Sequence, residues 1–160
     1  IHDYIGTNAR MTEIQSMIGL EQIKKLDLYL KKRNQNATYL TKHLSKFQSI
    51  ITPTHIPNYQ HSFYRYVIRL NFSYIKKQYN QQRILELLNK NNVFANVGGC
   101  PAIYKEKYFK NNKIQPRFKS INTEQLTKTS ISFQIDHTIT KSNLTKMLKK
   151  IIKVLKVINK

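Results

Sequence analysis

The chain has 160 residues, 40% of them hydrophobic, which is enough for about one domain with a core of its own. It carries 28 Lys and Arg against 8 Asp and Glu, a formal net charge of +20, and its single cysteine, Cys100, excludes an internal disulfide framework and a metal site built from several cysteines. No apolar run approaches the roughly 20 residues of a membrane span, and the opening residues are unlike a signal peptide, so we expect no membrane segment and a cytoplasmic location.

The first half of the chain begins with a long predicted helix. Apolar residues recur at helical spacing over residues 12–45, and Thr12 is a typical N-cap. Gly19 is expected to be a mild break within this helix. An extended loop with two prolines follows, and the aromatic and β-branched residues 63–70 then predict a strand.

The second half alternates short strands and helices. Helical spacing predicts a helix over residues 79–90, and residues 93–97 predict a short strand that ends at a Gly-Gly-Cys-Pro turn. Residues 104–127 are irregular, with two short helical pieces. Apolar residues alternate over 130–136, which predicts a strand, and a closing amphipathic helix runs from about residue 141 to the end. The predicted fold class is therefore α/β, as a small α+β domain: a long N-terminal helix leads into a small mixed sheet with helices.

The positive charge has two interpretations. A strongly basic domain can bind nucleic acid or another polyanion. Alternatively, Lys, Asn and Ile all have A/T-rich codons, and this chain is rich in all three, so compositional drift would scatter lysines over solvated surfaces. In the closing helix the lysines fill the positions between the apolar ones, which is typical of a solvated face. We therefore favour drift and do not expect nucleic-acid binding, and an RNA-binding or polyanion-binding module remains the alternative.

The residues by themselves indicate little chemistry. None of the five histidines forms a pair with metal-ligand spacing, so we expect no metal site. Acidic residues are too few to support catalysis by paired carboxylates. Cys100 follows two glycines, yet an ordinary thiol is favoured over a nucleophile, which would need a base and an anion-stabilising group. We therefore predict no catalytic residue within this chain.

Five blocks of the sequence resemble motifs of one enzyme family. Residues 6–15 read Gly-Thr-Asn-Ala-Arg-Met-Thr-Glu-Ile-Gln and resemble the Gly-x-Asn-x-Arg-Met-x-Glu-x-Gln motif of the DegT/StrS sugar-nucleotide aminotransferases. Residues 61–66 are similar to that family's His-Ser-Tyr-Tyr strand, and residues 100–109 to a Cys-x-Glu-Ile-Tyr-x-Glu-Lys-x-Phe stretch of one branch. Residues 129–133 and 138–140 resemble the closing blocks. The blocks follow the family's order across essentially the whole chain.

This resemblance implies a fold-type I enzyme that uses pyridoxal 5′-phosphate (PLP). Such an enzyme moves an amino group from an amino acid, such as glutamate, to a keto-sugar nucleotide for cell-surface polysaccharide or amino-sugar biosynthesis. In the family, the cofactor domain with its Schiff-base lysine precedes the first motif. Residues 1–46 are then expected to be the linking segment and long helix of that domain, and residues 47–160 the small C-terminal α/β domain. The chain thus resembles a truncated or split enzyme, inactive alone, that works as a homodimer or with a complementary N-terminal half.

The resemblance also suggests four site residues. Asn8 matches the asparagine that reaches the PLP phosphate of the neighbouring subunit, and Arg10 is either a second phosphate contact or a structural ion-pair partner. His61 and Tyr104 either border the sugar-nucleotide pocket or serve in packing. The apolar stripe of the long helix, from Ile14 to Leu44, is expected to pack partly on the missing domain or on a partner subunit. Left uncovered, it would make the chain self-associate.

Overall fold

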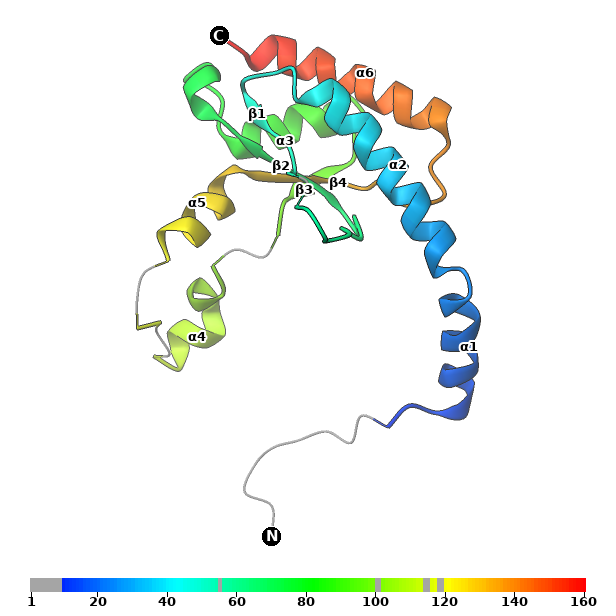
Figure 1. The fold of residues 1–160 in the computed structure, drawn as a ribbon. Coiled ribbons are helices and arrows are strands. Elements are labelled where there is room, and N and C mark those ends of the chain that lie inside the picture. The colour runs from blue at the N-terminus through cyan, green and yellow to red at the C-terminus, as the bar shows by residue number, and fades with distance from the viewer. Residues whose placement is uncertain (1–9, 55, 100–101, 114–115, 118–119) are drawn as a thin grey trace.

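A small antiparallel sheet forms the centre of the fold in this computed structural model (Figure 1). The structure describes residues 10–54, 56–99, 102–113, 116–117 and 120–160. The strands are β1 (Ile50–Ile51), β2 (Tyr66–Leu70), β3 (Ala95–Val97) and β4 (Ser130–Phe133). Their order in the sheet is β1-β2-β4-β3, and each neighbouring pair is antiparallel. The predicted α/β class is confirmed. The expected mixed sheet is instead antiparallel throughout, because each strand returns beside a neighbour that runs the opposite way.

Six helices and two 3₁₀ turns surround this sheet. The α-helices are α1 (Glu13–Ile23), α2 (Leu26–Leu44), α3 (Gln81–Lys90), α4 (Lys107–Asn111), α5 (Ile121–Thr129) and α6 (Lys141–Ile158). The 3₁₀ turns are η1 (Phe72–Tyr74) and η2 (Ile103–Lys105). Helix α6 packs against both α2 and α3, and together these three helices cover one face of the sheet (Figure 1). None of the described helices is long and apolar enough to cross a membrane.

The core lies between this helical layer and the sheet. Alternate residues of β2 and β4 point into it, with Tyr66, Ile68 and Phe133 at most 2% exposed. Helix α6 contributes its predicted apolar stripe, including the buried Leu148 and Ile151, and leaves its lysines on the outer side. Burying apolar surface contributes about 25 cal/mol per Å². The periodicity of the sequence therefore identified the faces that hold the domain together.

Side-chain caps fix where several helices begin. Thr12 and Gln15 form a capping box at the start of α1, as the N-cap prediction required. Asn80, Ser120 and Thr140 cap α3, α5 and α6 by accepting a hydrogen bond from the backbone N–H three residues later. Each cap satisfies an N–H that has no partner within its helix.

The predicted long helix over residues 12–45 is in fact two helices. The break falls at Lys24 and Lys25, whereas Gly19 lies inside α1. At the break the Lys25 N–H bonds to the Gln22 carbonyl (3.1 Å), three residues back instead of four, and this tighter turn redirects the chain. Helix α2 then stays on the domain, while α1 points away from it (Figure 1).

Helix α1 has no buried residue, although it is rich in large apolar side chains. Ile14, Met17, Ile18, Leu20 and Ile23 are 57–75% exposed. At about 100° per residue these five side chains are spread around most of the helix instead of forming one stripe. A helix with apolar side chains around most of its circumference is normally buried on more than one side. The exposure of apolar surface expected from the sequence is therefore present over α1, where it is wider than a stripe, whereas Leu40 and Leu44 in the α2 part of the same stripe are buried in the core.

The predicted strand over residues 63–70 begins later, at Tyr66. Phe63 has a backbone φ of 43°, in the left-handed region that aromatic residues rarely adopt. This conformation turns the chain out of the extended path, and residues 64 and 65 form a bend before the strand begins. The strand predicted over 130–136 likewise stops at Phe133, although Ile135 is still buried.

Candidate functional site

The segment before α1 carries the two residues expected to contact a cofactor phosphate. Asn8 lies outside the described residues, and so does Cys100. Arg10 is described and exposed, two residues before the Thr12 cap. Among the described residues it has no ion-pair partner. Arg10 lies just before the N-terminal end of a helix, which is a favourable place for negative charge.

His61 lies in the loop between β1 and β2, where its ring is fixed on two sides. Its Nδ1 accepts a hydrogen bond from the Phe63 backbone N–H (2.8 Å), and its ring stacks on the Phe63 ring with centroids 4.1 Å apart. The His61 carbonyl accepts a hydrogen bond from Asn34 of α2 (2.9 Å). Since Nδ1 is the acceptor, the neutral imidazole carries its proton on Nε2, which can donate to a ligand.

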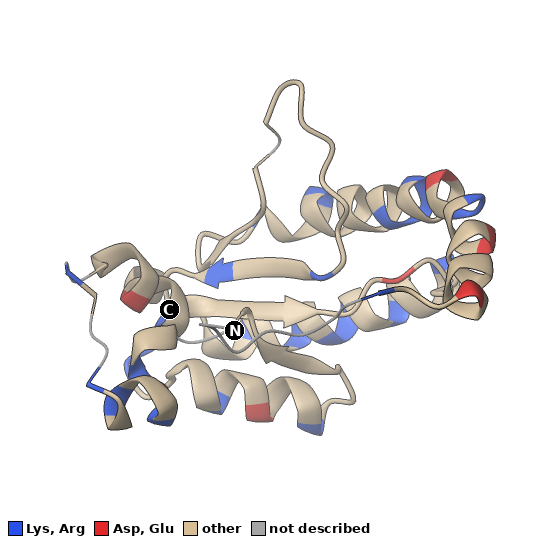
Figure 2. Cartoon of the chain, turned by 90° about the horizontal axis from the view of Figure 1, so that it is seen from below, with Lys and Arg blue, Asp and Glu red and all other residues tan. Residues whose placement is uncertain are grey.

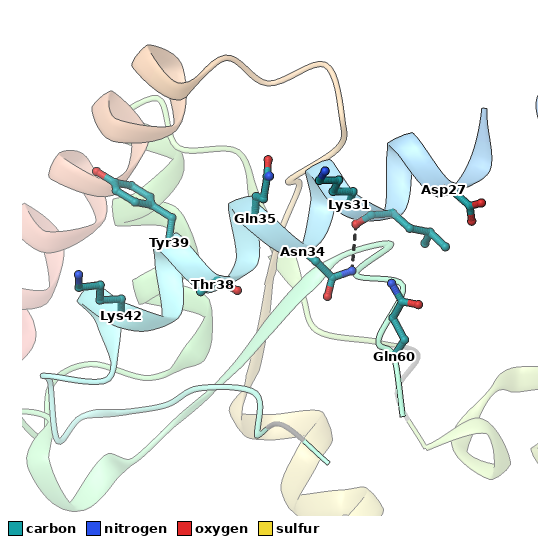
Figure 3. Close-up of a pocket in the computed structure, with 9 residues that line it drawn as sticks. Asp27, Lys31, Asn34, Gln35, Thr38, Tyr39, Lys42 and Gln60 are labelled. Carbon is teal, nitrogen blue, oxygen red and sulfur yellow. Dashed lines mark hydrogen bonds between the residues drawn. The ribbon is translucent and has the colours of Figure 1, made fainter. Parts of the chain in front are cut away.

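The loop and α2 enclose a wide groove. One hollow, of about 780 Å³, extends along α2 from Asp27 to Lys42, and Gln60 of the loop lies across from Asn34 (Figure 3). A second hollow, of about 930 Å³, continues on the loop side and includes His61. The two hollows share lining residues, Asn34 and Gln60 among them. Sites for drug-sized ligands occupy about 300–1,000 Å³. The groove is therefore large enough for a ligand or for a segment of another chain.

Tyr104 belongs to a polar cluster at the other side of the domain. Its hydroxyl donates a hydrogen bond to Oε1 of Glu124 on α5 (3.0 Å), and the Lys105 ammonium lies 3.1 Å from the same oxygen. Desolvation and the hydrogen bond to Glu124 raise the pKa of Tyr104, while the hydrogen bonds from Lys105 and Tyr104 lower the pKa of Glu124. The cluster thus holds a neutral phenol and an ionised carboxylate. Sequence reasoning identified Tyr104 but missed its partners, because their proximity depends on how η2 and α5 dock.

The described site residues occupy three separate places. Arg10 precedes α1, His61 lies beside α2, and Tyr104 is on η2; no described hydrogen bond or ion pair joins them. Figure 2 shows Lys and Arg residues distributed over several helices and also on β2. The described part of the chain holds no group of three or more His, Cys, Asp and Glu that could bind a metal ion. The described residues at these three places can each contact a ligand separately.

Comparisons with known proteins give these elements a family context. The aminotransferase from Psychrobacter cryohalolentis has a similar structure, with a TM-score of 0.86 and 26% identity over 99% of this chain and 42% of that one. Helicobacter pylori PseC, an aminotransferase involved in the biosynthesis of pseudoaminic acid, gives a TM-score of 0.79 at 22% identity, covering 97% of this chain and 40% of that one. An uncharacterized protein of Methanocaldococcus jannaschii is 29% identical over 96 residues, which are 60% of this chain and 24% of that protein.

These relatives are longer than the present chain, which spans between about a quarter and two fifths of their lengths. The model of the DegT/DnrJ/EryC1/StrS aminotransferase family matches residues 1–152, and this match covers the motifs before α1, in the β1–β2 loop and around β4. The chain therefore belongs to the DegT/DnrJ/EryC1/StrS aminotransferase family.

Proposed function

We propose that this chain forms the C-terminal part of a PLP-dependent sugar-nucleotide aminotransferase and that it needs a cofactor domain to be active. The observation that carries the proposal is the likeness to the Psychrobacter cryohalolentis aminotransferase, which covers 99% of this chain but 42% of that enzyme. The enzyme would transfer an amino group from an amino acid such as glutamate to a keto-sugar nucleotide, in polysaccharide or amino-sugar biosynthesis in the cytoplasm. Neither the scattered basic residues nor the family match supports the RNA-binding alternative.

The division of the chain follows from how α1 and the sheet domain are built. Residues 1–46 would lead from the cofactor domain along α1 and α2, and residues 47–160 would form the small domain. The exposed apolar side chains around α1 support this division, because their burial requires contacts that the small domain does not supply. Two neighbours, the cofactor domain and the second subunit of a homodimer, would cover a helix that is apolar on several sides.

The chain's own residues would support the cofactor from its phosphate end. PLP supplies the electron sink that makes amino-group transfer possible. Asn8 would donate its amide N–H to a phosphate oxygen across the subunit interface, and the exposed Arg10 guanidinium fits a second, charge-assisted contact. These residues fit a supporting role only, because a lysine for covalent attachment and a ring-stacking residue would come from the cofactor domain.

His61 and Tyr104 are proposed to border the sugar nucleotide. The Nε2 proton of His61 can donate to a phosphate or hydroxyl oxygen, since its Nδ1 is held by the Phe63 N–H. The phenol oxygen of Tyr104 can still accept a hydrogen bond while its proton points to Glu124. Both residues would therefore orient a bound substrate without taking part in proton transfer.

The test is to read the coding sequence that adjoins this chain and to produce the chain together with the cofactor domain expected there. The complex should copurify, absorb as a PLP enzyme and transfer an amino group from glutamate to a keto-sugar nucleotide. Burying one isoleucine is worth about 1.5–3 kcal/mol, so Ile14→Asp in α1 should weaken the complex by roughly ten- to a hundred-fold. Gln22→Asp, on the polar side of α1, is the matched control. An adjoining sequence unrelated to a cofactor domain, or a complex with no transferase activity, would contradict the proposal.

A further inference from the structure

A small cavity lies apart from the candidate site residues Arg10, His61 and Tyr104, where α2 passes the ends of β2 and β4. It measures about 180 Å³. Its lining includes two arginines: Arg33 of α2 and Arg65, the residue that directly precedes β2. Asn96 of β3 and Asp136, which follows shortly after the end of β4, also line it. Arg33 and Arg65 are 32 residues apart in sequence, and only the docking of α2 on the sheet brings them to one place.

Neither of these arginines forms an ion pair within the described part of the chain. The ion pairs there are Lys24–Glu21 and Lys105–Glu124, and neither includes Arg33 or Arg65. Arg33 has a fully buried Nε with no hydrogen-bond partner. Buried N–H donors nearly always have a partner, because leaving one unpaired forfeits its hydration without replacement. The Nε of Arg33 therefore has no hydrogen-bond acceptor within the described part of the chain.

Other residues beside the cavity contact one another, but none of these contacts pairs the two arginines with an anion. The Arg65 guanidinium lies 5.8 Å from the centroid of the Tyr64 ring, a cation–π contact that positions the charge without cancelling it. The Asp136 carboxylate accepts hydrogen bonds from Thr138 and from the Gln134 side chain. Partial burial raises the pKa of Asp136, but these hydrogen bonds outweigh it and lower the pKa overall. Asp136 is thus ionised, bonded to its own turn, and contributes one negative charge to the rim.

We propose that this cavity binds a small oxyanion, a carboxylate or a phosphate, between the guanidinium groups of Arg33 and Arg65. Guanidinium groups bind carboxylate and phosphate oxygens through paired N–H donors. A volume of about 180 Å³ admits an anion with a short tail, and it is too small for a nucleoside diphosphate sugar. Two arginines and one carboxylate leave a net charge of +1, which matches a singly charged carboxylate better than a doubly charged phosphate. This inference goes beyond the proposed function and does not depend on PLP.

The test uses the 160-residue chain and follows the Arg33 and Arg65 Nε–H resonances by NMR while sodium acetate or sodium phosphate replaces sodium chloride at constant ionic strength. We expect both resonances to shift in a saturable way, with acetate binding more tightly than phosphate. Arg65→Gln should weaken binding at least fivefold. Arg69→Gln is the matched control, because Arg69 is an exposed arginine of β2 outside the cavity, and it should leave binding unchanged.

The same titration distinguishes the possible outcomes. Tighter phosphate binding that still requires both arginines would keep the site and assign it to phosphate. Shifts that stay linear with concentration, or that Arg69→Gln reduces as much as Arg65→Gln, would overturn the proposal. Because Arg33 is partly buried, Arg33→Lys is used beside Arg33→Gln, with thermal unfolding as the check of folding. Arg33→Lys keeps the charge but loses the buried Nε, so it should bind more weakly than the unmodified chain.

Discussion

Gly98 lies directly after β3, where the chain passes unusually close to β4. Its N–H donates a hydrogen bond to the Ser130 carbonyl (2.9 Å). A methyl group built on Gly98 would stand 2.2 Å from the Ser130 Cβ and 3.0 Å from both the Ser130 carbonyl carbon and the Val67 Cγ1. Carbon atoms in contact normally lie about 3.5–4.0 Å apart. Gly98→Ala would therefore push β3 away from β4 by on the order of 1 Å, since the Ser130 Cβ is fixed to the backbone and cannot rotate away.

The expected cost follows from overpacking measured in other protein cores, about 1–3 kcal/mol, and the backbone location places Gly98→Ala near the upper end. For a chain of this size each kcal/mol lowers the melting temperature by roughly 2–4 °C, so we expect Tm to fall by about 6–12 °C. Circular dichroism during heating measures this change. Gly99→Ala is the matched control, because no described atom beyond its chain neighbours lies within 4 Å of its added methyl group, and Tm should stay nearly constant.

A second variant tests the cause of that loss. Ser130→Gly removes the clashing Cβ, so the double variant Gly98→Ala/Ser130→Gly should lose less stability than the sum of the two single variants. Ser130→Gly alone has its own cost, since the Ser130 hydroxyl donates to the Leu126 carbonyl (2.7 Å). If Gly98→Ala melted within about 1 °C of the unmodified chain, or if the two substitutions were additive, the close approach of β3 and β4 would be refuted.

Three further predictions concern pH, association and the cofactor. Burial raises the pKa of Tyr66 to about 12, against an ordinary value near 10, so Tyr66 loses its proton more readily in the unfolded chain. Stability should be unaffected by this group below pH 10 and should fall between pH 10 and 12; urea unfolding of Tyr66→Phe should lack this part of the decline. Sedimentation of the chain alone should reveal self-association that Ile14→Asp reduces, and a monomer that Ile14→Asp does not change would contradict the role of α1. In the complex with a cofactor domain, Asn8→Ala should weaken PLP binding by roughly three- to thirty-fold, the loss of one hydrogen bond to a charged group; equal affinities by absorbance titration would remove Asn8 from the site.

The sequence by itself determined the local structure well where one face of an element is buried. The lysines and apolar residues of α6 alternate with helical spacing, and Leu148 and Ile151 are indeed buried. The alternation around β4 likewise placed Ile131 and Phe133 in the core. Periodicity is readable in these cases because burial selects every second residue of a strand and every third or fourth of a helix. The family motifs were also readable, because they are continuous stretches of sequence.

Only the tertiary structure decided what each face packs against. No residue between Ile23 and Leu26 predicts a helix break, yet the chain turns there: α2 rests on the domain, whereas α1 buries no residue against the described part of the chain. The meeting of Arg33 with Arg65, and of Tyr104 with Glu124, is equally invisible in the sequence. Hydrophobic periodicity records that a face is buried but carries no information about its partner, since apolar contact is not directional. The antiparallel pairing of β2 with β4, which are separated by about 60 residues, therefore follows from packing and not from any local signal.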